Sequence, residues 1–223
     1  HFRPVSHYFR QNFSQVTNPP IDSLRENKVM SLKTRFGNLG NILDFDNLTE
    51  ENIYVLDSPI LTNSQLKKFK KFFSKKTKEI DCTFNISSSL KERIEEIREE
   101  AETSVREGST CLILSDKNIS NKRASIPSIL TVGAVHSHLV KLGLRGYCSL
   151  NVECSDALDT HSFAILIGVG ATTVNPYLAI DSIYQRFEKK LFGKSDFETC
   201  VVKFKKAIDA GLLKIMSKMG ISV

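Results

Sequence analysis

Short apolar runs alternate with amphipathic stretches five times between residues 53 and 192, and this alternation constrains the fold more than any other feature of the chain. The apolar runs are Ile53–Leu56, Ile80–Phe84, Cys111–Leu114, Tyr147–Val152 and Ala171–Val174. The helices predicted to follow them are Ser64–Phe73, Ser87–Glu107, Ile126–Leu142, Leu158–Leu166 and Tyr177–Phe192. Nearly continuous apolar strands joined by helices are typical of a parallel sheet covered by helices.

Five such units are too few to close an eight-stranded barrel. The sequence therefore predicts an α/β fold, either an incomplete (β/α) barrel-like arrangement or an open parallel sheet of about five strands, with an N-terminal helical extension. In that extension we expect helices over His1–Phe13 and Leu24–Arg35, and near the other end a helix over Phe197–Ala210. We divide the chain into an N-terminal helical segment (1–50), a βα-repeat core (51–195) and a C-terminal helical segment (196–223).

Residues 15–22, which we call the proline loop, form the least generic segment of the chain. Pro19 and Pro20 lack a backbone N–H donor and disfavour helix in the residue before them, so Asn18 should be extended. A side-chain oxygen at position 22 or 23 can then cap a helix that starts at about Leu24. Such a stiff loop is either a plain helix connector or the lining of a site. Its polar side chains are Gln15, Thr17 and Asn18.

Composition narrows the range of possible settings. The content of 41% hydrophobic and 25% charged residues is ordinary for a globular protein, and the apolar stretch around Phe163–Val174 is shorter than the ~20 residues that span a bilayer. No signal-peptide pattern opens the chain, and it begins at His1 without a methionine, so we expect a segment of a longer protein. Cys82, Cys111 and Cys148 lie in apolar runs without a CxxC pair, which indicates reduced, buried thiols and favours a cytoplasmic location.

The most basic stretch, residues 67–78, permits two interpretations. Leu66, Phe69 and Phe73 share one helical face, with the lysines largely on the other, as in a solvated amphipathic helix. Together with the net charge of +6, the same lysines could instead form the nucleic-acid-binding patch of a stand-alone interaction protein. The amphipathic helix is the favoured interpretation.

Polar residues follow several of the predicted strands, where parallel α/β folds place their sites. Asp116 and Glu153 could act as an acid and a base. Alternatively, they cap the next helix or pair with a nearby cation, for which the candidates are Lys117, Lys122 and Arg123. The full set of polar residues at strand ends is Asp57, Ser58, Asn85, Ser115, Asp116, Lys117, Glu153 and Asn175.

The histidines and glycines match no established motif. His136 and His138 are two residues apart, so on a helix they point about 200° away from each other and cannot share one metal ion. A metal hydrolase built on these two and His161 lacks a completing carboxylate or thiol, and structural roles are favoured. Gly168 and Gly170 follow a predicted helix rather than a strand, so they do not form a dinucleotide fingerprint.

Several longer motifs, in order along the chain, resemble one known family. The first is Tyr8–Glu26, which reads YFRQNFSQVTNPPIDSLRE. The later motifs are Val29–Leu32, Ser58–Asn63 (SPILTN), Ile113–Asp116 (ILSD), Ser125–His136 (SIPSILTVGAVH), Gly168–Leu178 and Gly211–Ser222. Over nearly its full length, the chain resembles the central, connecting domain of glutamate synthase large subunits.

The resemblance implies a fold and a setting. Glutamate synthase makes two glutamates from glutamine and 2-oxoglutarate, with electrons from a pyridine nucleotide or ferredoxin. In this family an amidotransferase domain releases ammonia, and a synthase domain holds FMN and an iron–sulfur cluster. The central domain is implied to be an incomplete barrel that connects these two domains, in the same or a neighbouring chain, and helps to wall the ammonia tunnel. It is implied to carry no catalytic residue, cofactor or metal, and no membrane partner is expected.

The resemblance also implies which residues lie at the tunnel or between domains. Gln15, Thr17 and Asn18 are implied to line it, with Gln11 and Arg25 in support. Amide and hydroxyl groups suit this role because they hydrogen-bond neutral ammonia without protonating it, whereas a carboxylic acid would trap ammonium.

Overall fold

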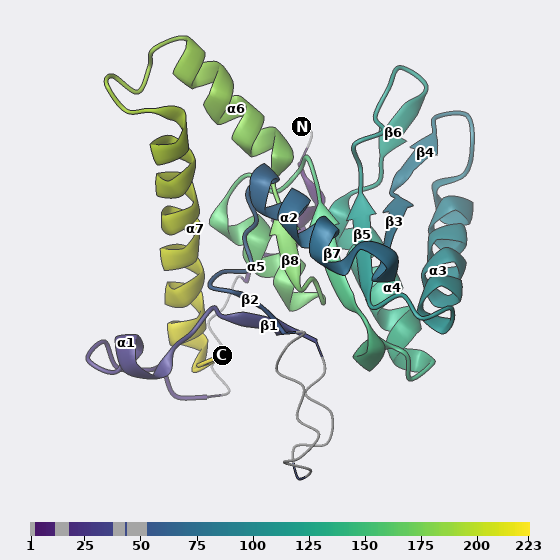
Figure 1. Ribbon diagram of the computed structural model, residues 1–223, viewed down its shortest axis with the longest axis horizontal. Coiled ribbons are helices and arrows are strands. Elements are labelled where there is room, and N and C mark those ends of the chain that lie inside the picture. The colour runs from purple at the N-terminus through teal and green to yellow at the C-terminus, as the bar shows by residue number, and fades with distance from the viewer. Residues whose placement is uncertain (1–2, 12–17, 38–42, 44–52) are drawn as a thin grey trace.

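The computed structural model describes residues 3–11, 18–37, 43 and 53–223 (Figure 1). The strands are β1 (Thr34–Phe36), β2 (Tyr54–Leu56), β3 (Thr77–Asp81), β4 (Thr83–Asn85), β5 (Cys111–Ser115), β6 (Arg123–Ser125), β7 (Ser149–Glu153) and β8 (Thr173–Asn175). The α-helices are α1 (Glu26–Val29), α2 (Asn63–Phe73), α3 (Leu90–Arg106), α4 (Ser128–Lys141), α5 (Thr160–Gly168), α6 (Tyr177–Glu188) and α7 (Phe197–Met219). The 3₁₀ turns are η1 (Val5–Phe9), η4 (Ser74–Lys76) and η5 (Arg145–Tyr147).

A parallel sheet with the strand order β3-β5-β7-β8 forms the centre of the molecule. Neighbours in the sheet are also successive parallel strands along the chain, as in a barrel. Ile60 adds a parallel bridge to Val174 at the β8 edge. In the described residues the strands do not close into a barrel, so the predicted open α/β fold is confirmed.

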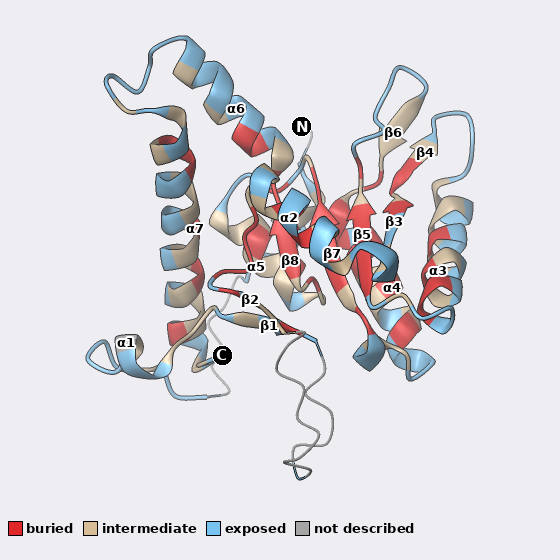
Figure 2. Ribbon diagram, in the orientation of Figure 1, coloured by how far each residue is buried: buried red, intermediate tan, exposed pale blue. Residues whose placement is uncertain are grey.

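The two faces of this sheet have different covers. Side chains alternate between faces along a strand, so Leu112 and Leu114 join the large core formed with α3, α4 and α5. Cys111 and Ile113 point to the opposite face and join a second, smaller core under α2 and the β1-β2 hairpin. Figure 2 shows the buried residues of both cores concentrated on and around the sheet.

The helix α2 forms where the lysine-rich stretch was predicted to be helical. Thr62 and Gln65 make a reciprocal capping box at its start, which satisfies two backbone N–H groups. Its buried side chains are Leu66 and Phe69, and the Phe69 ring meets that of Phe36 edge-on at 4.9 Å. The amphipathic interpretation of this stretch is therefore confirmed.

The N-terminal region departs from the prediction of two helices. The first is only the 3₁₀ turn η1, and the second is only the four-residue α1. Leu24 is 86% exposed, so the second stretch has no apolar stripe to bury, and packing of such a stripe supplies most helix stability in proteins. Thr34 and Arg35, predicted as the end of this helix, lie in the strand β1, which pairs antiparallel with β2.

Two of the predicted strands are also revised. Ile53–Leu56 does not join the parallel sheet, because its backbone pairs with β1 instead. Ile80–Phe84 divides into β3 and β4, and β4 leaves the sheet to pair antiparallel with β6. Arg123 holds this branch in place, since its guanidinium donates to Asp81 Oδ2 at 2.9 Å and to Thr83 Oγ1 at 2.7 Å.

The last helix, α7, is longer than predicted. It was expected to end at Ala210, but it continues through Gly211 to Met219. Gly211 lies where α7 crosses α5, and a Cβ there would lie 2.6 Å from Thr160 Cγ2. This glycine therefore permits close helix packing rather than ending the helix.

Among the described residues no helix is both long enough and apolar enough to span a bilayer. The division of the chain into segments 1–50, 51–195 and 196–223 stays a prediction.

Candidate functional site

The described part of the proline loop begins at Asn18 and turns at Asp22. Leu24 N donates to Asp22 Oδ1 at 2.8 Å, and Arg25 N donates to the carbonyl oxygen of Asp22 at 3.0 Å. Asp22, predicted to cap the start of a helix, therefore uses its side chain to close a turn instead. The helix α1 begins later than expected, at Glu26.

The predicted tunnel residues fall into two groups. Gln15 and Thr17 lie outside the described residues, so their placement stays a prediction. Gln11, Asn18 and Arg25 are all exposed. Arg25 Nε lies 3.3 Å from Asp22 Oδ2, and because both side chains are exposed, this pair adds no more than about 1 kcal/mol to stability. The supporting role of Arg25 and the lining role of Asn18 stay predictions.

The described part of the proline loop, residues 18–22, rests on the C-terminal end of α7. Ile21 N donates to the carbonyl oxygen of Ser217 at 2.9 Å. Ser217 Oγ donates to Glu26 Oε1 at 2.6 Å, and this hydrogen bond, with Lys214 nearby, holds the pKa of Glu26 below its usual value. Just beyond, Ser31 N donates to the carbonyl oxygen of Ser222 at 2.9 Å. Figure 1 shows the segment around α1 beside this end of the long helix.

Sequence reasoning missed this contact. Ser217 and Glu26 are separated by almost the whole chain, and neither belongs to a pattern that predicts pairing. The available signal was weak: the segments Tyr8–Glu26 and Gly211–Ser222 were both among the motifs of the family resemblance.

At the carboxyl end of the sheet, Glu153 is buried in a network of charges. Lys117 Nζ lies 2.7 Å from Glu153 Oε1, and Lys70 Nζ lies 3.4 Å from Oε2. Ser115 Oγ also donates to Oε2, at 3.0 Å. Burial alone would raise the pKa of Glu153, but the hydrogen bond from Lys117 and the charge of Lys70 hold it below its usual value. The alternative prediction of an ion pair with Lys117 is confirmed.

Asp116 has a different set of partners. Its Oδ2 accepts from Ser155 N at 3.0 Å and from Ser155 Oγ at 2.6 Å, which ties the end of β5 to the loop after β7. Burial raises the pKa of Asp116. The carboxylates of the predicted acid and base therefore have different side-chain partners, and Asp116 N donates to the carbonyl oxygen of Glu153 at 3.2 Å.

Other polar residues at strand ends contact the backbone or the side chains of neighbouring segments. Asn175 Nδ2 donates to the carbonyl oxygen of Leu61 at 2.9 Å, which fixes the bridging segment beside β8. Asn85 Oδ1 accepts from Ser87 N at 3.0 Å. Ser58 Oγ donates to Asp209 Oδ1 on α7 at 2.6 Å. Asp57 is near Lys33 at the surface, at 3.9 Å.

The three histidines suggested for a metal hydrolase have separate partners. Arg145 Nε donates to His136 Nδ1 at 3.2 Å, and His138 Nε2 lies 2.8 Å from Glu102 Oε2. His161 Nε2 lies 3.0 Å from the carbonyl oxygen of Ser6. No group of three or more metal-ligating side chains gathers in the part of the chain that the structure describes.

Cys82, Cys111 and Cys148 are buried as predicted. Cys154 and Cys200, for which no burial was predicted, are buried as well, and all five are free thiols. Burial raises the pKa of Cys111 to about 11 and that of Cys82 to about 12. Because the thiolate is the nucleophile, these two cysteines are poorly suited to covalent chemistry.

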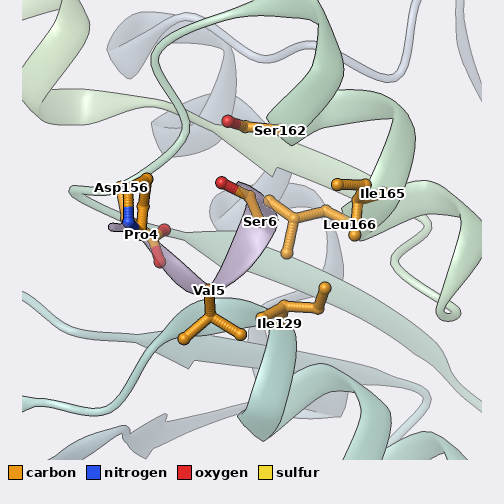
Figure 3. A pocket seen from close by; sticks show the side chains of 8 residues that line it. All are labelled: Pro4, Val5, Ser6, Ile129, Asp156, Ser162, Ile165 and Leu166. Carbon is orange, nitrogen blue, oxygen red and sulfur yellow. The ribbon is translucent and has the colours of Figure 1, made fainter. Parts of the chain in front are cut away.

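A small cavity of about 30 Å³ lies between η1, α4 and α5 (Figure 3). Val5, Ile129 and Leu166 give it apolar walls, while Ser6 and Ser162 contribute hydroxyl groups. Its volume holds about one water molecule. The cavity is too small for a flavin or a nucleotide.

The family described as "Glutamate synthase central domain" matches residues 1–223. The chain belongs to the glutamate synthase central domain family. The family resemblance carried by the sequence motifs is therefore confirmed.

Individual relatives agree with this assignment. The chain is 53% identical, over all of its length, to the glutamate synthase [NADPH] large chain of Azospirillum brasilense. Over 96% and 97% of its length it is 40% identical to the corresponding large chain of Bacillus subtilis (strain 168) and to the chloroplastic ferredoxin-dependent glutamate synthase of Spinacia oleracea. The match spans only 15%, 14% and 14% of those three proteins.

These relatives also bear on the alternative of a nucleic-acid-binding module. They are glutamate synthases by name, and the comparisons give that alternative no support. In the structure Lys70 is engaged with Glu79, at 2.9 Å, as well as with Glu153. At least one lysine of the basic stretch therefore has a structural role inside this domain.

Proposed function

We propose that this central domain connects the amidotransferase domain of a glutamate synthase to its FMN-binding synthase domain, in the same or a neighbouring chain. The enzyme would make two glutamates from glutamine and 2-oxoglutarate. The observation that carries the proposal is the family match over residues 1–223. The engagement of Glu153 and Asp116 within the fold supports a connecting rather than a catalytic role.

The proposal extends to the passage of ammonia. Gln15, Thr17 and Asn18 would line the passage, with Gln11 and Arg25 in support. Asn18 is exposed in this domain and therefore available to a neighbouring domain. Its amide both donates and accepts hydrogen bonds without giving up a proton, which lets ammonia pass in its nucleophilic, neutral form.

The cofactors would belong to the synthase domain. FMN and an iron–sulfur cluster would bind there and carry the electrons from the donor to the site of reduction. Relatives of this domain include enzymes named for NADPH and for ferredoxin, so either electron donor is compatible with it. A fluorescence titration of this chain with FMN should show no stoichiometric binding, and tight binding would contradict the connecting role.

Substitution of Asn18 in the full-length glutamate synthase that contains this domain tests the ammonia passage. Asn18→Ala should release ammonia to solvent, so that several glutamines are hydrolysed for each one used in synthesis. Glutamine hydrolysis alone, and synthesis from saturating ammonium, should stay near the parent rates.

The matched control is Asn121→Ala, which removes an exposed amide from the turn before β6 and should leave the coupling unchanged. An equal loss of both half-reactions in Asn18→Ala would count against a passage role, because it would indicate general damage.

A further inference from the structure

The end of α7 approaches the proline loop more closely than any residue with a side chain would allow. Gly220 ends the helix with φ of 68°, in the left-handed region. A Cβ at this position would lie 2.6 Å from the carbonyl oxygen of Pro19 and 2.7 Å from Asn18 Cβ. Contacts this short essentially never occur between real atoms of these types, so Asn18 and Pro19 would have to move.

Not every left-handed glycine after a helix has such a close neighbour, although Gly170, after α5, has the His136 side chain where its Cβ would lie. Gly143, after α4, has the same φ of 68° but open space around its missing Cβ. The same is true of Gly108, with φ of 96°, and Gly193, with φ of 62°. Left-handed backbone alone explains those three glycines. Gly220 also meets a steric requirement that comes from the loop.

Ser217, one turn earlier, holds the next part of the loop. It is only 3% exposed, and its carbonyl oxygen accepts from Ile21 N. Its hydroxyl is within reach of two acceptors, Glu26 Oε1 at 2.6 Å and the Ile21 carbonyl oxygen at 3.2 Å. The segment from Asn18 to Glu26 is therefore fixed on α7 at two adjacent points by contact and by hydrogen bonds.

Other contacts of α7 attach it to segments beside the parallel sheet. Asp209 accepts from Ser58 Oγ, and Lys205 Nζ lies 3.2 Å from Gln65 Oε1, so α7 is tied to the segment that bridges β8 and to the start of α2. Gly211 sets its close packing on α5. The helix is thus a rigid link between the parallel sheet and the residues at the loop.

We propose that Gly220 and Ser217 are positioning residues, which hold Asn18 at the ammonia passage by fixing residues 18–22 on the end of α7. This inference rests on the proposed function of the domain. Gly220 excludes any side chain between the helix end and Pro19, and Ser217 binds Ile21 and Glu26. Neither residue needs to touch ammonia, because each acts through the position of Asn18.

The test compares Gly220→Ala with Gly143→Ala in the full-length enzyme. Both variants place an alanine at the same left-handed φ, but only Gly220→Ala forces Asn18 and Pro19 to shift. Gly220→Ala should raise the ratio of glutamine hydrolysed to glutamate formed several-fold, with synthesis from saturating ammonium within about twofold of the parent enzyme. Gly143→Ala should keep the parent ratio. Equal ratios in the two variants would overturn the proposal.

A second pair of variants covers the case in which Gly220→Ala does not fold. Ser217→Ala removes the hydroxyl that binds Glu26, whereas Glu26→Gln keeps an acceptor for that hydroxyl. Ser217→Ala should raise the ratio of glutamine hydrolysed to glutamate formed, and it should speed hydrogen exchange at the Ile21 amide about tenfold. Glu26→Gln should leave this ratio and this exchange rate near the parent values. Unchanged coupling in Ser217→Ala would overturn the positioning role.

Asn18→Ala separates this inference from the function on which it rests. Uncoupling in Asn18→Ala, together with normal coupling in Gly220→Ala and Ser217→Ala, would refute the positioning role and leave the passage intact. Normal coupling in Asn18→Ala would refute the passage and the positioning role together.

Discussion

Glu153 is a buried carboxylate that faces two ammonium groups, Lys117 and Lys70. Glu153→Gln keeps the shape of the side chain but removes the carboxylate from Lys117, whose side chain is 48% exposed, while Lys70 keeps Glu79 at 2.9 Å. Because only Glu153 is buried in this network, its loss should cost about 2 kcal/mol, between the cost of a surface pair and that of a buried pair. We expect that loss of unfolding free energy at pH 7, measured by urea denaturation of the chain.

The matched control for Glu153→Gln is Glu79→Gln. Glu79 also binds Lys70, but its side chain is 55% exposed, so its removal should cost less than about 1 kcal/mol. Similar losses for the two variants would show that burial does not strengthen the Glu153 network.

The pH dependence of the Glu153 contribution follows from the direction of its pKa shift. The pKa is lower in the folded chain than the ordinary value of 4.5. The ionised carboxylate therefore stabilises the fold above that ordinary value, and this stabilisation is lost as the pH falls through the folded pKa. The stability difference between the parent chain and Glu153→Gln should be largest near neutral pH and shrink under acid conditions. A difference that grows on acidification would contradict the network.

At the scale of elements, two glycines inside helices have opposite surroundings. Gly133 in α4 has open space around its missing Cβ, whereas a Cβ on Gly211 in α7 would lie 2.6 Å from Thr160 Cγ2. Alanine gains about 1 kcal/mol over glycine in a helix interior. Gly133→Ala should therefore stabilise the chain by up to about 1 kcal/mol.

Gly211→Ala should instead destabilise the chain, because the overpacking between α7 and α5 costs about 1–3 kcal/mol and offsets the helix gain. Thr160→Ser, which removes the methyl group nearest to the new Cβ, should recover part of the loss in the double variant. Thermal denaturation of the parent chain, Gly211→Ala, Thr160→Ser and the double variant gives the comparison. Stabilisation by Gly211→Ala alone would show that the two helices separate without cost.

The parallel strands and Gly211 show what the sequence could predict and what it could not. Apolar runs such as Cys111–Leu114 predicted the parallel strands because burial on both faces requires an apolar residue at nearly every position. Gly211 was expected to follow the end of a helix, since glycine is common there. Its actual role depends on Thr160, and no local pattern shows which residue a glycine will face.

The same limit applies to the candidate site. The stiffness of the proline loop could be predicted from Pro19 and Pro20, because their backbone restrictions are local. Its support could not, since the partners Ser217 and Gly220 come from the opposite end of the chain. Ile53–Leu56 was assigned to the parallel sheet for a similar reason: its composition is that of a strand, but composition does not specify the pairing partner.

At the scale of the whole molecule, the sheet carries two cores of unequal size. The larger lies under α3, α4 and α5, and the smaller lies under α2 and the β1-β2 hairpin. Phe69 is fully buried in the smaller core and packs edge-on against Phe36. Phe163 is fully buried in the larger core. A layer with few buried contacts opens locally more easily than the sheet that it covers.

Phe69→Ala should loosen the smaller layer selectively. Truncation of a buried phenylalanine costs about 3–5 kcal/mol, which corresponds to at least about a hundredfold faster exchange where opening is local. Hydrogen exchange at the β1 and β2 amides should increase by that factor, with a smaller change in β7. Phe163→Ala, the matched variant in the larger core, should raise exchange in β7 and in the smaller layer together. Equal acceleration of all strands by both variants would mean that the two cores unfold as one unit, because local opening of the smaller layer would then not precede global unfolding.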